Sequence, residues 1–189
     1  MRCWDPRDAP LLKDAVDSSL EDLRPWMPWA VDEPQPLEEK VALLRRFRGR
    51  FDLGEDFTYG ILDDSETVAF GGTGLHTRSG ANTLEIGYWI RSSHAGRGLA
   101  TESTAALVRV AFEVCGVERV LIRTDPANER SRAIPRRLGF VEEATLRRGL
   151  DYPEPRDVVV YTMFRGEFRK APVQDTPLEA FDASGRRLL

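Results

Sequence analysis

The chain has little of the chemistry that builds metal sites or holds small secreted proteins together. Among its 189 residues are two cysteines and two histidines. Two cysteines are too few for a disulfide framework, so we expect reduced thiols and a cytoplasmic location. Cys3, Cys115, His76 and His94 form no motif with metal-ligand spacing, and no metal site is predicted.

Long hydrophobic segments are also missing. No apolar run approaches the roughly 20 residues that span a bilayer, and the chain does not open with a signal-peptide pattern. Hydrophobic residues make up 41% of the chain and charged residues 31%, which is typical of a globular protein with a substantial core. We therefore expect a single domain without a membrane partner.

Charge is unevenly distributed along the sequence. Residues 1–90 have ten basic and 17 acidic side chains, a balance of −7, whereas residues 91–150 have 11 basic and seven acidic ones, a balance of +4. All the basic residues of the second region are arginines, which suit phosphate contact. The acidic region favours a cationic ligand. A pI near 5.4 argues against a general nucleic-acid binder, so no nucleic-acid partner is expected.

A glycine-rich turn separates the apolar run Leu84–Ile90 from a segment with helical periodicity. The turn reads Ala95-Gly-Arg-Gly-Leu-Ala-Thr101. Glycines allow close approach to the backbone, and free N–H groups at a helix N-terminus favour a phosphate or pyrophosphate. The turn lacks the third glycine of a dinucleotide fingerprint and the Gly-Lys-Ser/Thr of a P-loop. By itself it leaves open a purely conformational role for Gly96 and Gly98.

The rest of the chain alternates strand-like and helix-like patterns. We expect helices at about 10–23, 37–51, 99–115 and 129–138, and strands at about 2–4, 57–62, 68–76, 83–90, 118–124, 140–146 and 157–164. A meander followed by alternating strands and helices predicts a mixed α/β sheet. The polar segment 166–176 is expected to be loose, and 178–185 to form a short strand and turn.

A second strand–helix unit, together with the glycine-rich turn, resembles a known family. After the strand-like run 117–124 come Asn128, Ser131 and Ile134, and the helix pattern ends in Leu138-Gly-Phe140. These residues resemble the GNAT superfamily of acyl-CoA-dependent N-acyltransferases. The specificity lies in the combination of the two motifs, since either one alone is common.

The segment Leu23-Arg-Pro-Trp-Met-Pro-Trp29 narrows the resemblance to one branch. It is similar to the N-terminal signature of RimJ/RimL-type enzymes, the ribosomal-protein N-terminal acetyltransferases. Together the similarities cover the chain from about Arg2 to Phe164.

The resemblance implies an α/β (α+β) fold with a mixed, mostly antiparallel sheet of about seven strands flanked by helices. The fourth and fifth strands would splay apart in a V. Residues 1–165 would form the acyl-CoA N-acyltransferase domain and 166–189 a C-terminal extension. The resemblance also implies acetyl-CoA as co-substrate, an amine acceptor and a monomer or homodimer.

The resemblance also implies which residues contact CoA. The glycine-rich turn would bind the pyrophosphate through Gly96, Arg97, Gly98, Ala100 and Thr101. Backbone groups at the end of the fourth strand would contact pantetheine and the thioester carbonyl, and these belong to Trp89, Ile90 and Arg91. Asn128 would lie beside the pantetheine arm, with a simple helix cap as the alternative.

The proton-transfer residues depart from the family pattern. Pro135 occupies the position of the Tyr with which many members protonate the leaving thiolate. The alternative of the RimL branch, Ser131, is present, although serine is also common at helix starts. The base of that branch falls at Leu150, which leaves the neighbouring Asp151 and the strand residue Glu85. We predict Ser131 and Glu85 as catalytic residues, with a solvent-facing role as the alternative for Glu85.

The expected acceptor site lies beside Trp26 and Trp29, unless these side chains pack in the core. An α-amine, with a pKa of ~7.7–8.0, is roughly a tenth neutral at pH 7, whereas lysine is neutral in fewer than about one molecule in a thousand. A site without an evident strong base therefore suits an α-amine. We predict direct acetyl transfer in a ternary complex to a protein or peptide N-terminus, a ribosomal protein included.

Two alternatives remain open at this point. One is an acyltransferase for a small amine such as a polyamine or an aminoglycoside. The other is a CoA-binding module without turnover, which Pro135, Leu150 and Ala95 favour, because Ala95 replaces the usual Arg or Gln of the family. Release of CoA in the presence of peptides and amines discriminates between these functions.

Overall fold

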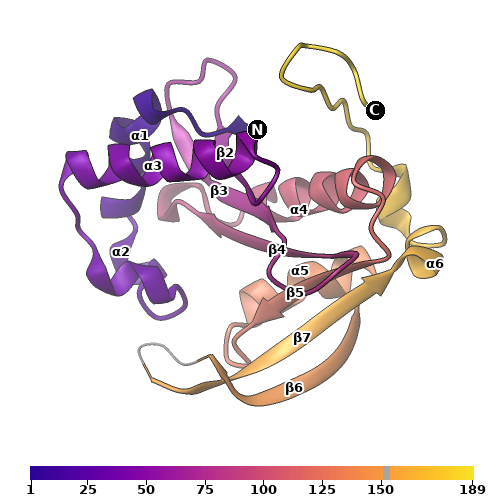
Figure 1. Ribbon diagram of the computed structural model, residues 1–189. Coiled ribbons are helices and arrows are strands. Elements are labelled where there is room, and N and C mark those ends of the chain that lie inside the picture. The colour runs from indigo at the N-terminus through magenta and orange to yellow at the C-terminus, as the bar shows by residue number, and fades with distance from the viewer. Residues whose placement is uncertain (151–153) are drawn as a thin grey trace.

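A seven-stranded sheet runs through the molecule in the order β1-β2-β3-β4-β5-β7-β6 (Figure 1). The computed structural model describes residues 1–150 and 154–189. The strands are β1 Arg2–Cys3, β2 Phe57–Leu62, β3 Ala69–His76, β4 Thr83–Ile90, β5 Arg119–Thr124, β6 Val141–Leu150 and β7 Arg156–Phe164. Among these described strands, β4 and β5 are the one parallel pair. The predicted mixed, mostly antiparallel sheet is confirmed.

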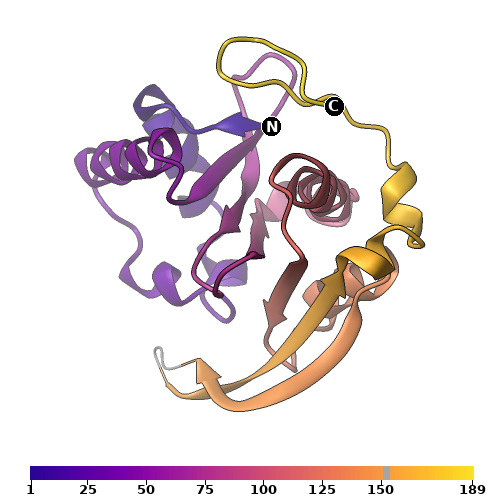
Figure 2. The ribbon, with the colours of Figure 1, turned by 45° about the vertical axis from the view of Figure 1, so that its right-hand side comes forward.

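Helices flank this sheet in two groups. They are α1 Ala9–Asp17, α2 Leu20–Leu23, α3 Leu37–Asp52, α4 Leu99–Arg109, α5 Glu129–Leu138 and α6 Arg165–Phe168. The first three lie beside β1 to β3, and α4 and α5 lie beside the second half of the sheet (Figures 1 and 2). A π-helical segment, Val110–Val114, continues α4 to the end of the expected helix. No helix in the described part of the chain is both long and apolar enough to cross a membrane.

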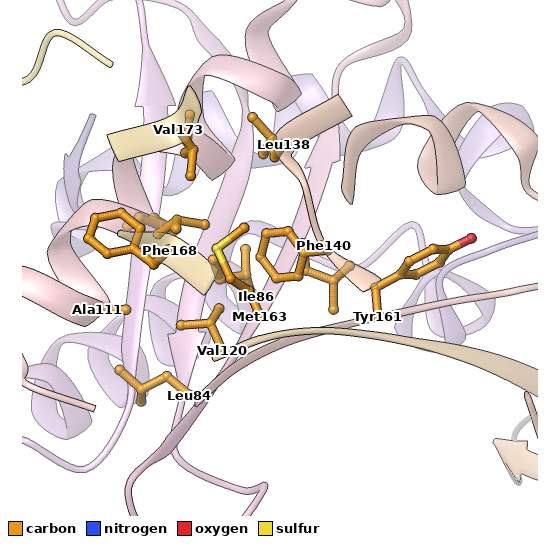
Figure 3. Close-up of a cluster of buried hydrophobic side chains, with 14 of the residues drawn as sticks. Leu84, Ile86, Ala111, Val120, Leu138, Phe140, Tyr161, Met163, Phe168 and Val173 are labelled. Atoms are coloured by element: carbon orange, nitrogen blue, oxygen red, sulfur yellow. The ribbon is translucent and has the colours of Figure 1, made fainter. Parts of the chain in front are cut away.

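The larger core cluster lies between the sheet and α4 and α5 (Figure 3). Strand residues such as Ile86, Val120 and Tyr161 meet helix residues such as Leu107 and Leu138 there, and all five are buried. A second cluster, which includes Trp4, Val16 and Leu44, packs α1 and α3 against the N-terminal strands. The sheet is thus covered by apolar helix faces on both halves, as the helical periodicity of the sequence predicts.

The single helix expected at 10–23 is wrong, because the chain breaks between α1 and α2. Ser18 Oγ donates to Asp14 O and Ser19 Oγ donates to Ala15 O, both at 2.7 Å. Such side-chain bonds compete with the helical backbone. Ser19 Oγ also accepts the N–H of Ser92 at 3.0 Å, so the break ties the N-terminal helices to the segment after β4.

The segment 166–176 is also not loose, contrary to expectation. Phe168 of α6 and Val173 of the following 3₁₀ turn, Pro172–Asp175, are buried in the larger core cluster. The strand expected at 178–185 is reduced to a single bridge between Phe181 and Arg187. The two apolar residues therefore anchor the polar sequence around them, which residue composition did not reveal.

Candidate active site

The glycine-rich turn has the backbone geometry of an anion cradle. Gly96 and Gly98 have positive φ angles of 78° and 85°, and Gly98 is the N-cap of α4. A Cβ on either glycine would meet nothing within 4 Å, so the surrounding space is open. Within the described residues, no protein acceptor takes the N–H of Gly96, Arg97 or Gly98. These N–H groups and the N-terminus of α4 are available to a phosphate.

An arginine from α5 joins this turn. Arg137 Nη1 lies 3.4 Å from the hydroxyl of Thr101 in the first turn of α4. Ala100 and Thr101 are half-buried, whereas Arg97 and Arg137 are exposed. The guanidinium of Arg137 therefore adds positive charge beside the N-terminus of α4. The sequence did not predict Arg137 as part of this site, because Arg137 and Thr101 are 36 residues apart and come together only when the chain folds. The arginine-rich composition of residues 91–150 did point to this region.

The predicted splay between the fourth and fifth strands is visible in the strand register. β4 pairs with β5 only from Thr83 to Glu85, opposite Arg119 to Leu121. β4 continues to Ile90 and β5 to Thr124, and the two strands diverge (Figure 2). One edge of the last five residues of β4 therefore lacks a strand partner, and its backbone groups are free for a ligand.

Trp89 and Ile90 lie on this unpaired part of β4, but Arg91 is engaged elsewhere. Its N–H donates to Phe70 O at 2.7 Å, and its carbonyl accepts the N–H of His94 at 2.9 Å. Its guanidinium pairs with Asp14 of α1 at 2.8 Å. Hydrogen-bonded pairs alternate along the antiparallel β3–β4 ladder, so the backbone of Trp89 bonds to Gly72 of β3. Of the three predicted residues, only Ile90 therefore presents its backbone at the unpaired edge, whereas Arg91 fixes the end of β4 to α1.

Asn128 and Ser131 form the start of α5. Asn128 Oδ1 accepts the N–H of Ser131 at 3.0 Å, so Asn128 is an N-cap whatever else its amide binds. The hydroxyl of Tyr88, from β4, lies 3.1 Å from Ser131 Oγ and donates to Ser131 O at 3.1 Å. Burial raises the pKa of Tyr88 to about 12, so the phenol is protonated at neutral pH. Sequence reasoning missed Tyr88.

Glu85 is buried at the last paired position of β4, with 4% of its surface exposed. Arg78 Nη2 donates to its carboxylate at 2.5 Å and Ser79 Oγ at 2.8 Å, and Arg123 Nε lies 3.7 Å away. Burial by itself raises the pKa of Glu85, but the hydrogen bond and charge of Arg78 outweigh it and lower the pKa below its ordinary value. The carboxylate is therefore ionised at neutral pH and faces two arginines.

The loop after α2 brings one of the two predicted acceptor residues, Trp29, to the end of β4. The rings of Trp29 and Trp89 meet edge to face, with centroids 5.8 Å apart. The indole of Trp89 lies over Gly72 of β3, where a Cβ would come within 2.6 Å of its Nε1. Trp26 and Trp29 keep 36% and 39% of their surfaces exposed, so both remain available to a ligand.

Buried and cross-chain contacts hold this loop in place. Lys40 of α3 and Glu33 form a buried ion pair, and Arg24 Nη2 donates to Glu33 O at 2.7 Å. From the other half of the sheet, Arg156 Nη1 of β7 donates to Pro25 O at 2.6 Å. The tryptophan loop is thus fastened to α3 and to the β6–β7 hairpin. The alternative base, Asp151, lies outside the described residues.

Comparisons with known proteins agree with this geometry. Residues 1–141 match the family model described as the acetyltransferase (GNAT) domain. The Bacillus subtilis protein named "Putative ribosomal N-acetyltransferase YdaF" is 29% identical over 170 residues, which are 89% of this chain and 92% of YdaF. The Escherichia coli [ribosomal protein uS5]-alanine N-acetyltransferase is 26% identical over 142 residues, 72% of each chain.

A solved structure shows the same fold at similar coverage. Mycobacterium smegmatis RimJ in complex with CoA-disulfide superposes with a TM-score of 0.81 at 25% identity, over 92% of this chain and 85% of RimJ. The family model covers three quarters of the present chain, and the splay, the glycine-rich turn and the Asn-led helix occupy the expected places in the sheet. The chain therefore belongs to the GNAT acetyltransferases, the N-acetyltransferases whose co-substrate is acetyl-CoA.

Proposed function

We propose that the protein acetylates the α-amine of a protein or peptide N-terminus by direct attack on acetyl-CoA in a ternary complex. The contact between Trp29 and Trp89 supports this proposal, because it brings a loop of the acidic N-terminal region to the open end of β4. A cationic acceptor is favoured there. The named activity of the uS5-alanine N-acetyltransferase supports the same substrate class.

For the co-substrate, we propose that the pyrophosphate binds the backbone from Gly96 to Thr101. Positive φ at both glycines, open space around them and the N-terminus of α4 support this assignment. Arg97 and Arg137 would balance the remaining phosphate charge. Trp89, Ile90 and Asn128 would contact the pantetheine arm. This arm would carry the thioester to the splay between β4 and β5.

The chemistry needs a neutral amine, a polarised thioester and a protonated leaving group. The amine nitrogen attacks the thioester carbon, the C–S bond breaks, and its electron pair stays on sulfur. Ser131 Oγ–H passes its proton to the sulfur, and the proton lost by the attacking nitrogen restores the serine.

Glu85 has a supporting role in this scheme. Its lowered pKa makes it a weak base, but its negative charge stays in place at neutral pH. We propose that it accepts, through water, the proton that a protonated acceptor amine must lose before it can attack. An α-amine suits such a site, because a useful fraction is already neutral at pH 7.

A kinetic panel tests the proposal. Peptides with a free N-terminus, the same peptides with a blocked N-terminus and an internal lysine, and polyamines are compared by CoA release and product mass. We expect free N-terminal peptides to have the highest kcat/KM, and mass spectrometry to locate the acetyl group on the α-amine. Higher kcat/KM for blocked lysine peptides or polyamines would overturn the α-amine assignment and leave the acetyltransferase activity intact.

A further inference from the structure

Helix α5 contains a proline that removes one of its own hydrogen bonds. Pro135 has no N–H, so the carbonyl of Ser131, four residues earlier, loses its helical donor. The proline ring also crowds that carbonyl. Tyr88 Oη donates to Ser131 O at 3.1 Å. A side chain of β4 thus supplies the hydrogen bond that the helix cannot make.

The same phenol also meets the side chain of Ser131. Tyr88 Oη and Ser131 Oγ are 3.1 Å apart. Tyr88 lies three residues beyond Glu85, the last residue of β4 that pairs with β5, whereas Ser131 follows β5 in the chain. The contact therefore links β4 to the helix that follows β5, and one hydroxyl meets both the carbonyl and the hydroxyl of Ser131.

We infer that Tyr88 is the positioning residue for Ser131: it fixes the first turn of α5 and orients the serine hydroxyl toward the leaving sulfur. This inference rests on the proposed function, in which Ser131 protonates the thiolate. The aromatic ring of Tyr88 packs against the larger core cluster, so the position of its hydroxyl is set by the core rather than by a mobile side chain.

The orientation of the Tyr88 and Ser131 hydroxyl protons determines whether the serine can donate to the sulfur. When the Tyr88 proton points to Ser131 O, the serine proton is directed at the phenol oxygen. When the Tyr88 proton turns to Ser131 Oγ, the serine proton is free to move to sulfur. The hydrogen bond from Tyr88 then stabilises the charge that develops on the serine oxygen. Tyr88 keeps its own proton, because its hydroxyl faces the carbonyl and hydroxyl of Ser131, and the proton that leaves the serine is replaced by the one lost from the attacking nitrogen.

A double-mutant cycle on turnover tests this role. We expect Tyr88→Phe, which preserves the packed ring, to lower kcat by about 10- to 100-fold with KM for acetyl-CoA within twofold. In a Ser131→Ala background the same change should have no further effect. Tyr59→Phe removes the hydroxyl of another half-buried tyrosine, on β2, and should leave kcat unchanged. Equal losses from Tyr88→Phe in both backgrounds would overturn the role in positioning.

A second cycle separates this role from helix capping and needs no turnover. Pro135→Ala restores an N–H for the Ser131 carbonyl. Tyr88→Phe should lower Tm by about 2–4 °C in the parent protein and by less in the Pro135→Ala background. The loss of kcat should persist in that background, because Ser131 Oγ still lacks its partner. Rescue of kcat by Pro135→Ala would show that Tyr88 acts only as a cap and would overturn the inference.

The two cycles also distinguish this inference from the α-amine assignment. If the amine panel identifies a different best acceptor, the kinetic cycle is run with that amine, and the α-amine assignment alone has failed. If Ser131→Ala has parental kcat with the best acceptor, the positioning role is overturned even though the protein acetylates α-amines.

Discussion

The two faces of β4 differ in chemistry, although their residues alternate along one strand. On one face, Tyr88 packs beside α4 and α5 and meets Ser131. On the other face, Trp89 packs toward the N-terminal helices and meets Trp29. Because successive side chains of a strand point to opposite faces, a single strand separates the two sides. The splay beyond Glu85 is where a ligand bound on one face can reach the other.

This comparison explains the uneven charge of the sequence. The face with α4 and α5 belongs mainly to the basic region 91–150, and the face with α1 to α3 belongs to the acidic region 1–90. An anionic co-substrate and a cationic acceptor would therefore approach from opposite sides of β4. Variants on each face should alter different kinetic constants.

The largest effect is expected from Ser131→Ala on the face with α5. Loss of a general acid typically costs about 10²–10⁴ in turnover. The Kd for acetyl-CoA, measured by calorimetry, should stay within a few-fold, because the Asn128 cap and the glycine-rich turn are unchanged. Near-parental kcat in Ser131→Ala would mean that orientation alone drives the reaction.

Gly98→Val should weaken acetyl-CoA binding by about 10- to 100-fold. A β-branched side chain is strained at a φ of 85° and stands where the backbone would meet pyrophosphate. Gly185 is a matched control, with a φ of 81° and open surroundings in the C-terminal segment. Calorimetry should give an unchanged Kd for Gly185→Val. An unchanged Kd for Gly98→Val would refute the assignment of the turn.

Trp29→Ala tests the other face and should raise the KM for the peptide acceptor by about tenfold, while Kd for acetyl-CoA stays the same. Leu53→Ala removes an exposed apolar side chain at the end of α3 and serves as the control. If Trp29→Ala instead weakens acetyl-CoA binding and leaves the peptide KM unchanged, the acceptor and acetyl-CoA do not bind on opposite faces of β4 as proposed.

The smallest effect is on stability. Because the folded pKa of Glu85 lies below its ordinary value of 4.5, its charge stabilises the fold above that pH, and this contribution is lost as the pH falls through the folded pKa. Glu85→Gln should destabilise the protein by about 1–3 kcal/mol at pH 7, and by progressively less below about pH 4. Thermal unfolding across this range measures the difference. A pH-independent difference would contradict the ionised pair with Arg78.

Local signals in the sequence predicted much of the fold. The positive φ at Gly96 and Gly98 and the N-cap at Asn128 follow from residue types whose backbone preferences are strong. The break at Ser18 and Ser19 was missed, because apolar periodicity takes no account of serine side chains that bond to their own helix, or of the contact between Ser19 and Ser92, 73 residues away. Helix periodicity cannot report such a partner.

The candidate site was predicted less completely, for the same reason. Tyr88 and Ser131 are 43 residues apart and meet only across the splay. A signal was nevertheless present: Pro135 inside a helix implies a carbonyl without its donor, and that carbonyl belongs to Ser131. The environment of Glu85 was not predicted, since Arg78 and Arg123 reach it from other elements.

The pH dependence of kcat/KM for a peptide with a free N-terminus tests the central claim most directly. The pKa of Glu85 is lowered and that of Tyr88 is raised to about 12. Glu85 therefore stays ionised and Tyr88 stays protonated between about pH 6 and pH 9. The free α-amine then governs the profile, which should rise about tenfold per pH unit and flatten near pH 8. A profile that still rises tenfold per unit past pH 9, as for a lysine amine, would contradict the account.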